Sequence, residues 1–133
     1  MLGADTNVLV RFITKDQAQQ SPQSHALIRA SGNQPIFICA IVLVELVWVL
    51  TKVKKLPQVE VLEICRDLMA NAAFKFERAD IIARALDEAQ AAGCDFADAL
   101  IVLSNAEAGC ESTATFDTDA LRLGGMVAVK ERL

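Results

Sequence analysis

Histidine, proline and glycine are scarce in this chain of 133 residues, and each shortage excludes a class of protein. There are only 3 prolines and 6 glycines, whereas 53% of the residues are hydrophobic. The chain is therefore not disordered, collagen-like or of low complexity. It has one histidine, His25, and 4 cysteines without a C-x-x-C pair, which argues against a Cys/His zinc site. The cysteines are interpreted as reduced thiols, several of them in the core, and this predicts a cytoplasmic protein.

Long apolar runs and an excess of positive charge are also missing. The most apolar stretch, residues 36–50, is too short to span a bilayer and contains Glu45, so we expect no membrane association. The first residues lack a basic region followed by an apolar run, which predicts no signal peptide. The net charge of −4 argues against a polybasic binder of nucleic acid or lipid. It is compatible with an enzyme that meets nucleic acid through a bound cation.

Short apolar strands alternate with helical patterns along the chain. The expected strands are residues 1–4, 35–39, 73–77, 112–116 and 126–130. The expected helices are residues 6–14, 21–31, 40–53, 57–70, 79–92 and 95–108. Helix 40–53 is apolar nearly all round, which predicts that it is buried. The alternation predicts an α/β fold, a single domain over residues 1–133 with a central, mainly parallel sheet flanked by helices on both faces.

Several acidic residues lie at strand ends or helix starts, where α/β sheets form their sites. Asp5 follows the first predicted strand, and Asp117 follows the fourth with Asp119 close behind. Each of these acids has an alternative role as a cap of the following helix. Asp95 and Asp98 open the helix 95–108, and a capping role explains one of them fully. We assign the cap to Asp95 and the chemistry to Asp98.

Glu45 lies in the middle of an apolar segment. A helical turn brings Ile41 and Trp48 alongside it, and Trp48 is interpreted as core rather than as a base-stacking platform. An unpaired buried carboxylate is costly, so a buried Glu45 must be neutral, paired or bound to a cation. The alternative is a polar stripe of Glu45 and Lys52 that faces water.

The chemistry follows if Asp5, Glu45, Asp98 and Asp117 converge. Four neighbouring carboxylates cannot all stay ionised without a cation, and oxygen-only ligands suit Mg²⁺ or Mn²⁺. Such a cluster performs metal-assisted phosphodiester hydrolysis, because the metal activates a water and stabilises the leaving oxygen. These four acids also account for the whole net charge of −4, so the metal-bound molecule need not repel a phosphate backbone.

Four segments that contain these acids make the chain similar to a known family. They are LGADTNVLVR at 2–11, LVELVWVL at 43–50, DFADALI at 95–101 and TFD at 115–117. In this order they resemble the PIN-domain family, and within it the VapC-type toxin ribonucleases of bacterial and archaeal toxin–antitoxin systems. The resemblance implies a single PIN-like domain with the four acids converging at one end of the sheet.

The resemblance also implies roles and partners. It makes Asp5, Glu45, Asp98 and Asp117 the catalytic acids, with Mg²⁺ on Asp5 and Asp98 and Mn²⁺ as a possible substitute. The expected partners are an RNA substrate of the tRNA or rRNA class, a cognate antitoxin protein and a second copy of the chain in a homodimer. The resemblance implies two supporting residues: Asn7 helps hold the first acid, and Thr115 precedes the fourth. Two further acids, Asp95 and Asp119, lie close enough in sequence to reach the metal.

Two other functions remain open from the sequence. A non-catalytic PIN-like domain that binds RNA or protein usually lacks one or more of the acids, and all four are present here. A phosphoryl-receiver domain also uses acids at strand ends with Mg²⁺, and Lys130 follows the last predicted strand. A receiver, however, needs a pair of acids after its first strand, where Asp5 stands alone. The basic cluster of Lys52, Lys54 and Lys55 is a candidate contact for an RNA backbone, or it complements a helix dipole.

Overall fold

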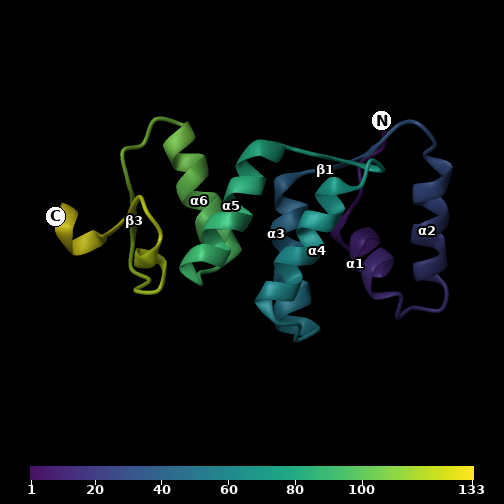
Figure 1. Ribbon diagram of the computed structural model, residues 1–133, viewed down its shortest axis with the longest axis horizontal. Coiled ribbons are helices and arrows are strands. Elements are labelled where there is room, and N and C mark those ends of the chain that lie inside the picture. The colour runs from purple at the N-terminus through teal and green to yellow at the C-terminus, as the bar shows by residue number, and fades with distance from the viewer. The chain divides into compact units, whose positions relative to one another are not determined.

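The computed structural model describes all 133 residues, which form two compact units, Met1–Ala79 and Asp80–Leu133 (Figure 1). Parallel strands and helices occur in both. The elements of the first unit are α1 (Thr6–Thr14), α2 (Gln20–Ala30), β1 (Ile36–Ile38), α3 (Ala40–Trp48), the π-helical η1 (Val49–Val53), α4 (Gln58–Ala70) and β2 (Phe74–Phe76).

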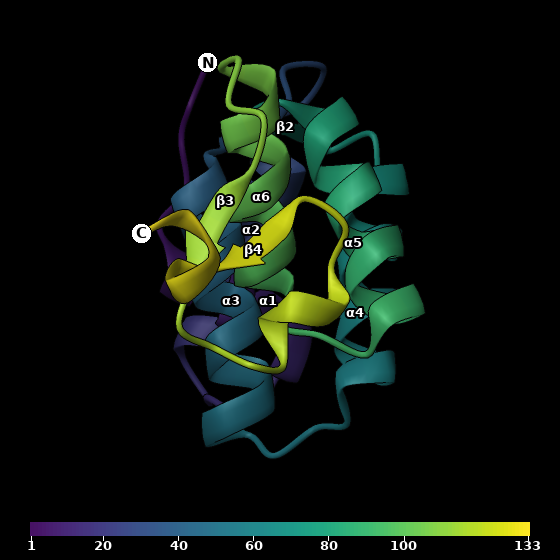
Figure 2. The ribbon, with the colours of Figure 1, turned by 90° about the vertical axis from the view of Figure 1, so that its left-hand side faces the viewer.

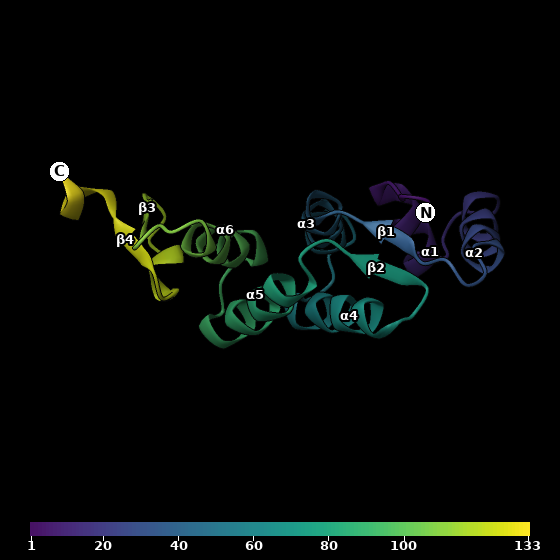
Figure 3. The same ribbon diagram turned by 90° about the horizontal axis from the view of Figure 1, so that it is seen from above.

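The sheet of the first unit is small and parallel. β1 pairs with β2 so that Ile36 lies opposite Phe74 and Ile38 opposite Phe76, and the two strands run side by side in Figure 3. On the other edge of β1, Gly3 forms a parallel bridge with Phe37. The first predicted strand is therefore reduced to a single bridge, but its parallel direction and its place before Asp5 agree with the sequence.

The core of the first unit joins its helices to this sheet. α1 packs against α2 and α3, and α3 packs against α4. Leu9 of α1, Leu43 and Leu46 of α3, and Leu62 of α4 are almost fully buried, because each lies on the inward face of its helix. Cys65 of α4 is also buried, and burial raises the pKa of its thiol to about 12, as expected for a core cysteine.

The predicted helix 40–53 differs from the structure in two ways. Its α-helical part ends at Trp48 and the chain continues as a π-helix through Val53. It is also not buried all round, because Ile41, Glu45 and Trp48 lie exposed on one face. An apolar sequence on every side does not reveal which side has a neighbour to pack against, and this face has none in the first unit.

The second unit contains two helices and a second pair of parallel strands. β3 pairs with β4 so that Thr113 lies opposite Met126 and Thr115 opposite Ala128, and Figure 2 shows both strands beside α6. The chain then turns into a 3₁₀-helix, so the last strand is shorter than predicted. The elements of this unit are α5 (Ala79–Ala92), α6 (Phe96–Glu107), β3 (Thr113–Thr115), η2 (Ala120–Arg122), β4 (Met126–Ala128) and η3 (Val129–Arg132).

The structure confirms the predicted α/β class, and every strand pair in it is parallel. Six α-helices connect the strands at places close to those that the sequence predicts. No helix has both the length and the apolar character needed to cross a membrane.

Candidate functional site

Thr6 connects two of the predicted catalytic acids. Asp5 is the N-cap of α1, and its Oδ1 accepts a hydrogen bond of 2.6 Å from the backbone N–H of Thr6. The hydroxyl of Thr6 donates a 3.0 Å hydrogen bond to Oε1 of Glu45 in α3. Thr6 is itself buried, so its two donors hold both carboxylates from a fixed position. The packing of α1 on α3 thus brings Asp5 and Glu45 to the same place.

Glu45 lies in an exposed position. The structure therefore contains the polar stripe of Glu45 and Lys52 that was the alternative to a buried carboxylate. The interpretation of Trp48 as a core residue is wrong, because 58% of Trp48 is exposed one turn after Glu45.

Asp98 is crowded by other carboxylates in the second unit. Partial burial raises its pKa most, and the charges of Asp95 and Asp117 raise it further. Asp95 is the N-cap residue of α6 as predicted, but its side chain makes no capping hydrogen bond. The negative charges of Asp95 and Asp117 therefore oppose ionisation of Asp98.

Asp117 and Asp119 have different environments. The backbone N–H of Asp119 donates to Oδ1 of Asp117 over 2.9 Å, and the N–H of Asp117 donates to the hydroxyl of Thr115 over 3.0 Å. The carboxylate of Asp119 forms an ion pair of 3.1 Å with Arg122, whereas Asp117 has no cationic partner. This difference favours Asp117 as the acid available to a metal, and Thr115 fixes the turn that carries it.

Asn7, Lys52 and Lys54 differ in their exposure and contacts. Asn7 is exposed in the first turn of α1, and the hydrogen bond to Asp5 comes from Thr6 instead. Lys54 is held in a 2.6 Å ion pair with Asp16, whereas Lys52 is exposed.

The donor set fits a hard cation such as Mg²⁺, because carboxylate oxygens are the ligands that this ion prefers. Asp5 and Glu45 belong to the first unit, and Asp98 and Asp117 belong to the second. In neither unit do three or more Asp, Glu, His or Cys side chains gather closely enough to hold a metal. The convergence of all four acids thus stays a prediction.

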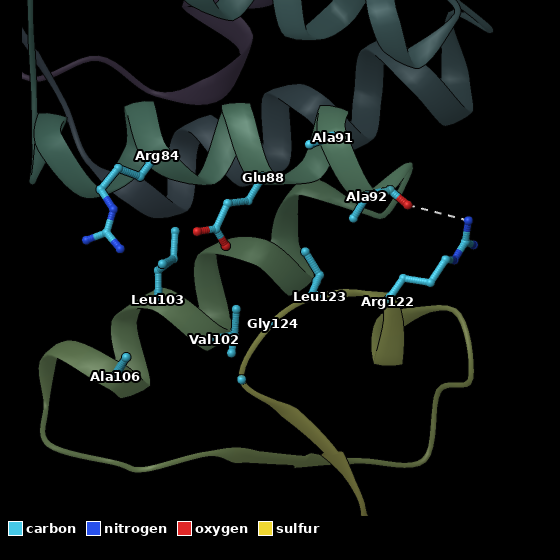
Figure 4. Close-up of a pocket in the computed structure, with 11 residues that line it drawn as sticks. Arg84, Glu88, Ala91, Ala92, Val102, Leu103, Ala106, Arg122, Leu123 and Gly124 are labelled. Atoms are coloured by element: carbon cyan, nitrogen blue, oxygen red, sulfur yellow. Dashed lines mark hydrogen bonds between the residues drawn. The ribbon is translucent and has the colours of Figure 1, made fainter.

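A hollow of about 520 Å³ lies between α5, α6 and the loop 123–125 of the second unit (Figure 4). Arg84 and Glu88 point into it from α5, and Arg122 donates a 3.5 Å hydrogen bond to the carbonyl of Ala92 at its rim. None of the predicted catalytic acids lines this hollow, so it is separate from the candidate site.

A family model described as the PIN domain matches residues 4–126, a range that contains every acid of the candidate site. No curated protein matches the chain.

Proposed function

Because the chain belongs to the PIN domain family, we propose that it is a Mg²⁺-dependent endoribonuclease that hydrolyses RNA phosphodiester bonds. Proteins of this family have a nuclease-like fold and are generally nucleases that bind divalent metal ions. The observation that carries the proposal is the family match over residues 4–126. The pairing of Asp5 with Glu45 through Thr6 supports it, as does the crowding of Asp98 by Asp117.

We assign the acids distinct roles. Asp5 and Asp98 bind the metal, and Glu45 and Asp117 complete the catalytic set. When bound, Mg²⁺ lowers the pKa of a coordinated water and neutralises charge on the phosphate, and Mn²⁺ substitutes for it because it prefers the same oxygen ligands. Thr6 orients Asp5 and Glu45 through its two hydrogen bonds.

The supporting residues act around this set. Thr115 fixes the backbone at Asp117, and Asp95 adds negative charge beside Asp98. Asp119 is held by Arg122, so we expect its removal to reduce activity less than the removal of Asp117. Asn7 is exposed two residues after Asp5 and is proposed to contact the substrate.

The decisive experiment is cleavage of total RNA by the purified protein with Mg²⁺, with EDTA, and with single amide variants. Asp5→Asn and Asp98→Asn should each lower cleavage by about 100-fold or more. Asn still caps a helix well, so Asp5→Asn should fold normally. Asp67→Asn is the matched control, since Asp67 is an exposed acid of α4 and should keep full activity. Equal cleavage by wild type and Asp5→Asn would show that the site is wrong.

We further propose that the protein is the toxin of a type II toxin–antitoxin pair and acts on tRNA or rRNA as a homodimer. The order of the four acidic segments along the chain supports this assignment. Expression in bacteria should arrest growth, Asp5→Asn should relieve the arrest, and a cognate antitoxin should do the same by binding the protein. Sequencing of the RNA ends identifies the substrate, and sedimentation gives the oligomeric state. Normal growth during expression of active enzyme would contradict the toxin role.

A further inference from the structure

One face of α3 and η1 carries an unusual set of exposed side chains. Ile41, Glu45, Trp48 and Lys52 follow one another at intervals of four, three and four residues, which places them along one stripe of the helix surface. We call these four residues the α3 stripe. Ile41 is 71% exposed and Trp48 is 58% exposed. The stripe thus presents an acid between two large apolar groups, with a cation at its end.

This pattern is unlike a helix surface that merely faces water. Exposing a tryptophan and an isoleucine on one face leaves apolar area in solvent, and such patches mark binding sites. It is also unlike the centre of an interface between protein chains, where charged residues are depleted, because Glu45 and Lys52 lie on either side of Trp48. An aromatic ring between an acid of the candidate site and a lysine suits a single-stranded nucleic acid instead.

We infer that Trp48 is a stacking platform for an unpaired base of the RNA substrate, and that Lys52 contacts the adjoining backbone. This inference rests on the proposed nuclease function. Trp48 lies one helical turn from Glu45, roughly 4.5 Å along the helix axis, so the stacked base belongs to a nucleotide beside Glu45. The indole offers a flat apolar surface that any base can cover.

The lysines near the stripe are not equivalent. The ammonium group of Lys54 is bonded to the carboxylate of Asp16 over 2.6 Å, and this ion pair ties the end of η1 to the segment after α1. Lys52 is exposed, without an ion pair, on the same face as Trp48. Of these two lysines, Lys52 is therefore the one that can pair with a phosphate without breaking an existing contact.

The sequence supplies a direct probe, because Trp48 is the only tryptophan and there is no tyrosine. We would titrate the Asp5→Asn protein, in Mg²⁺, with a ten-nucleotide oligouridylate that has no secondary structure. Stacking predicts saturable quenching of the Trp48 emission. An oligomer of the same length without bases should bind more weakly and leave the emission unchanged.

Affinity measurements with a labelled oligouridylate give an independent readout. Trp48→Ala in the Asp5→Asn background should weaken binding about 5- to 100-fold, and Trp48→Phe should recover part of the loss. Val59→Ala is the matched control, because Val59 is an exposed apolar residue of α4 outside the stripe, and it should not alter binding. Lys52→Gln should lower the slope of affinity against salt by about 1, whereas Lys54→Gln should leave it unchanged.

The outcomes separate this inference from the proposed function. Unchanged Trp48 emission at saturating oligonucleotide would overturn the stacking role, while RNA cleavage by the wild type would still support the nuclease. If Trp48→Ala instead converts a dimer to a monomer in sedimentation and leaves RNA affinity intact, the stripe is an interface between copies and the inference is wrong. Absence of cleavage by the wild type would reject the proposed function itself.

Discussion

At the scale of single residues, Gly125 lies in close contact with α6, where there is no room for a side chain. Its φ is +92°, and a Cβ placed on it would lie 2.9 Å from Cγ2 of Val102 in α6. Gly125→Ala should therefore lower the free energy of unfolding by about 1–3 kcal/mol, through backbone strain and overpacking. The neighbouring Gly124 has open space at its Cβ position, so Gly124→Ala is the control. Urea unfolding of both variants tests this, and equal losses would contradict it.

Thr6 allows a second prediction at this scale. Thr6→Val keeps the shape of the buried side chain but removes the hydroxyl that donates to Glu45. We expect kcat to fall about 10- to 100-fold with little change in KM, because a misoriented carboxylate affects the reacting groups more than substrate binding. Thr6→Ser restores the donor and should recover most of the activity. If Thr6→Ser is as impaired as Thr6→Val, the hydrogen bond from the hydroxyl to Glu45 does not contribute to activity.

The candidate acids are visible in the sequence, whereas the contacts around them are not. Asp5, Glu45, Asp98 and Asp117 stand out because the residue types and their places beside strands or within apolar helices are visible in the sequence. Thr6 was missed, although it follows Asp5 directly, because a threonine in a first helical turn is common and its partner lies in α3. Trp48 was misplaced because apolar composition does not reveal which helix face is covered.

At the scale of elements, Asp16 connects the end of α1 to the end of η1 through hydrogen bonds to Thr14 and Lys54. Its carboxylate accepts hydrogen bonds from Lys54 over 2.6 Å and from Thr14 over 2.8 Å. The hydrogen bond from Lys54 is the largest cause that lowers its pKa from 3.8 to about 2, and the bond from Thr14 adds to it. Because its pKa is lower in the folded protein than in the unfolded chain, ionised Asp16 stabilises the fold at pH values above 3.8. This stabilisation is lost as the pH falls through the folded-state pKa of about 2.

This element contact gives a pH-dependent prediction. Asp16→Asn should lower Tm by no more than a few degrees at pH 6, because the ion pair is exposed to solvent and to salt. The difference from wild type should shrink between about pH 4 and pH 2, as Asp16 takes up its proton in the folded state. Melting curves of both proteins across this range measure the effect. A difference in Tm that is constant with pH would assign it to something other than the charge.

The order of the elements was predictable, whereas most of their ends were not. The helices 6–14 and 79–92 were predicted to the residue, because Asp5 and Gly93 mark a cap and a stop. The strands β1 to β4 are three residues each where five were expected. The π-helical end of the predicted helix 40–53 depends on the backbone bond from Lys54 to Val49, which no sequence pattern indicates.

At the scale of the whole molecule, the four acids proposed to be catalytic are divided between the two units. The family match runs through both units, from residue 4 to residue 126, and it favours the nuclease interpretation over the receiver domain. These acids also equal the whole net charge of −4. Because the proposed ligands Asp5 and Asp98 belong to different units, binding of a divalent cation should affect the stability of the entire chain rather than of one unit.

Thermal unfolding in Mg²⁺ tests whether one metal site draws on both units. A ligand that binds only the folded state stabilises it by about 2.7 kcal/mol at 100 times its Kd, so Tm should rise steadily with Mg²⁺ concentration. Asp5→Asn, in the first unit, and Asp98→Asn, in the second, should each reduce this rise, while Asp67→Asn should retain it. A variant that has lost a repelling carboxylate should also melt no lower than wild type in EDTA. If Asp98→Asn keeps the full Mg²⁺ dependence and Asp5→Asn loses it, the metal is held by the first unit alone, and the four acids do not form one site.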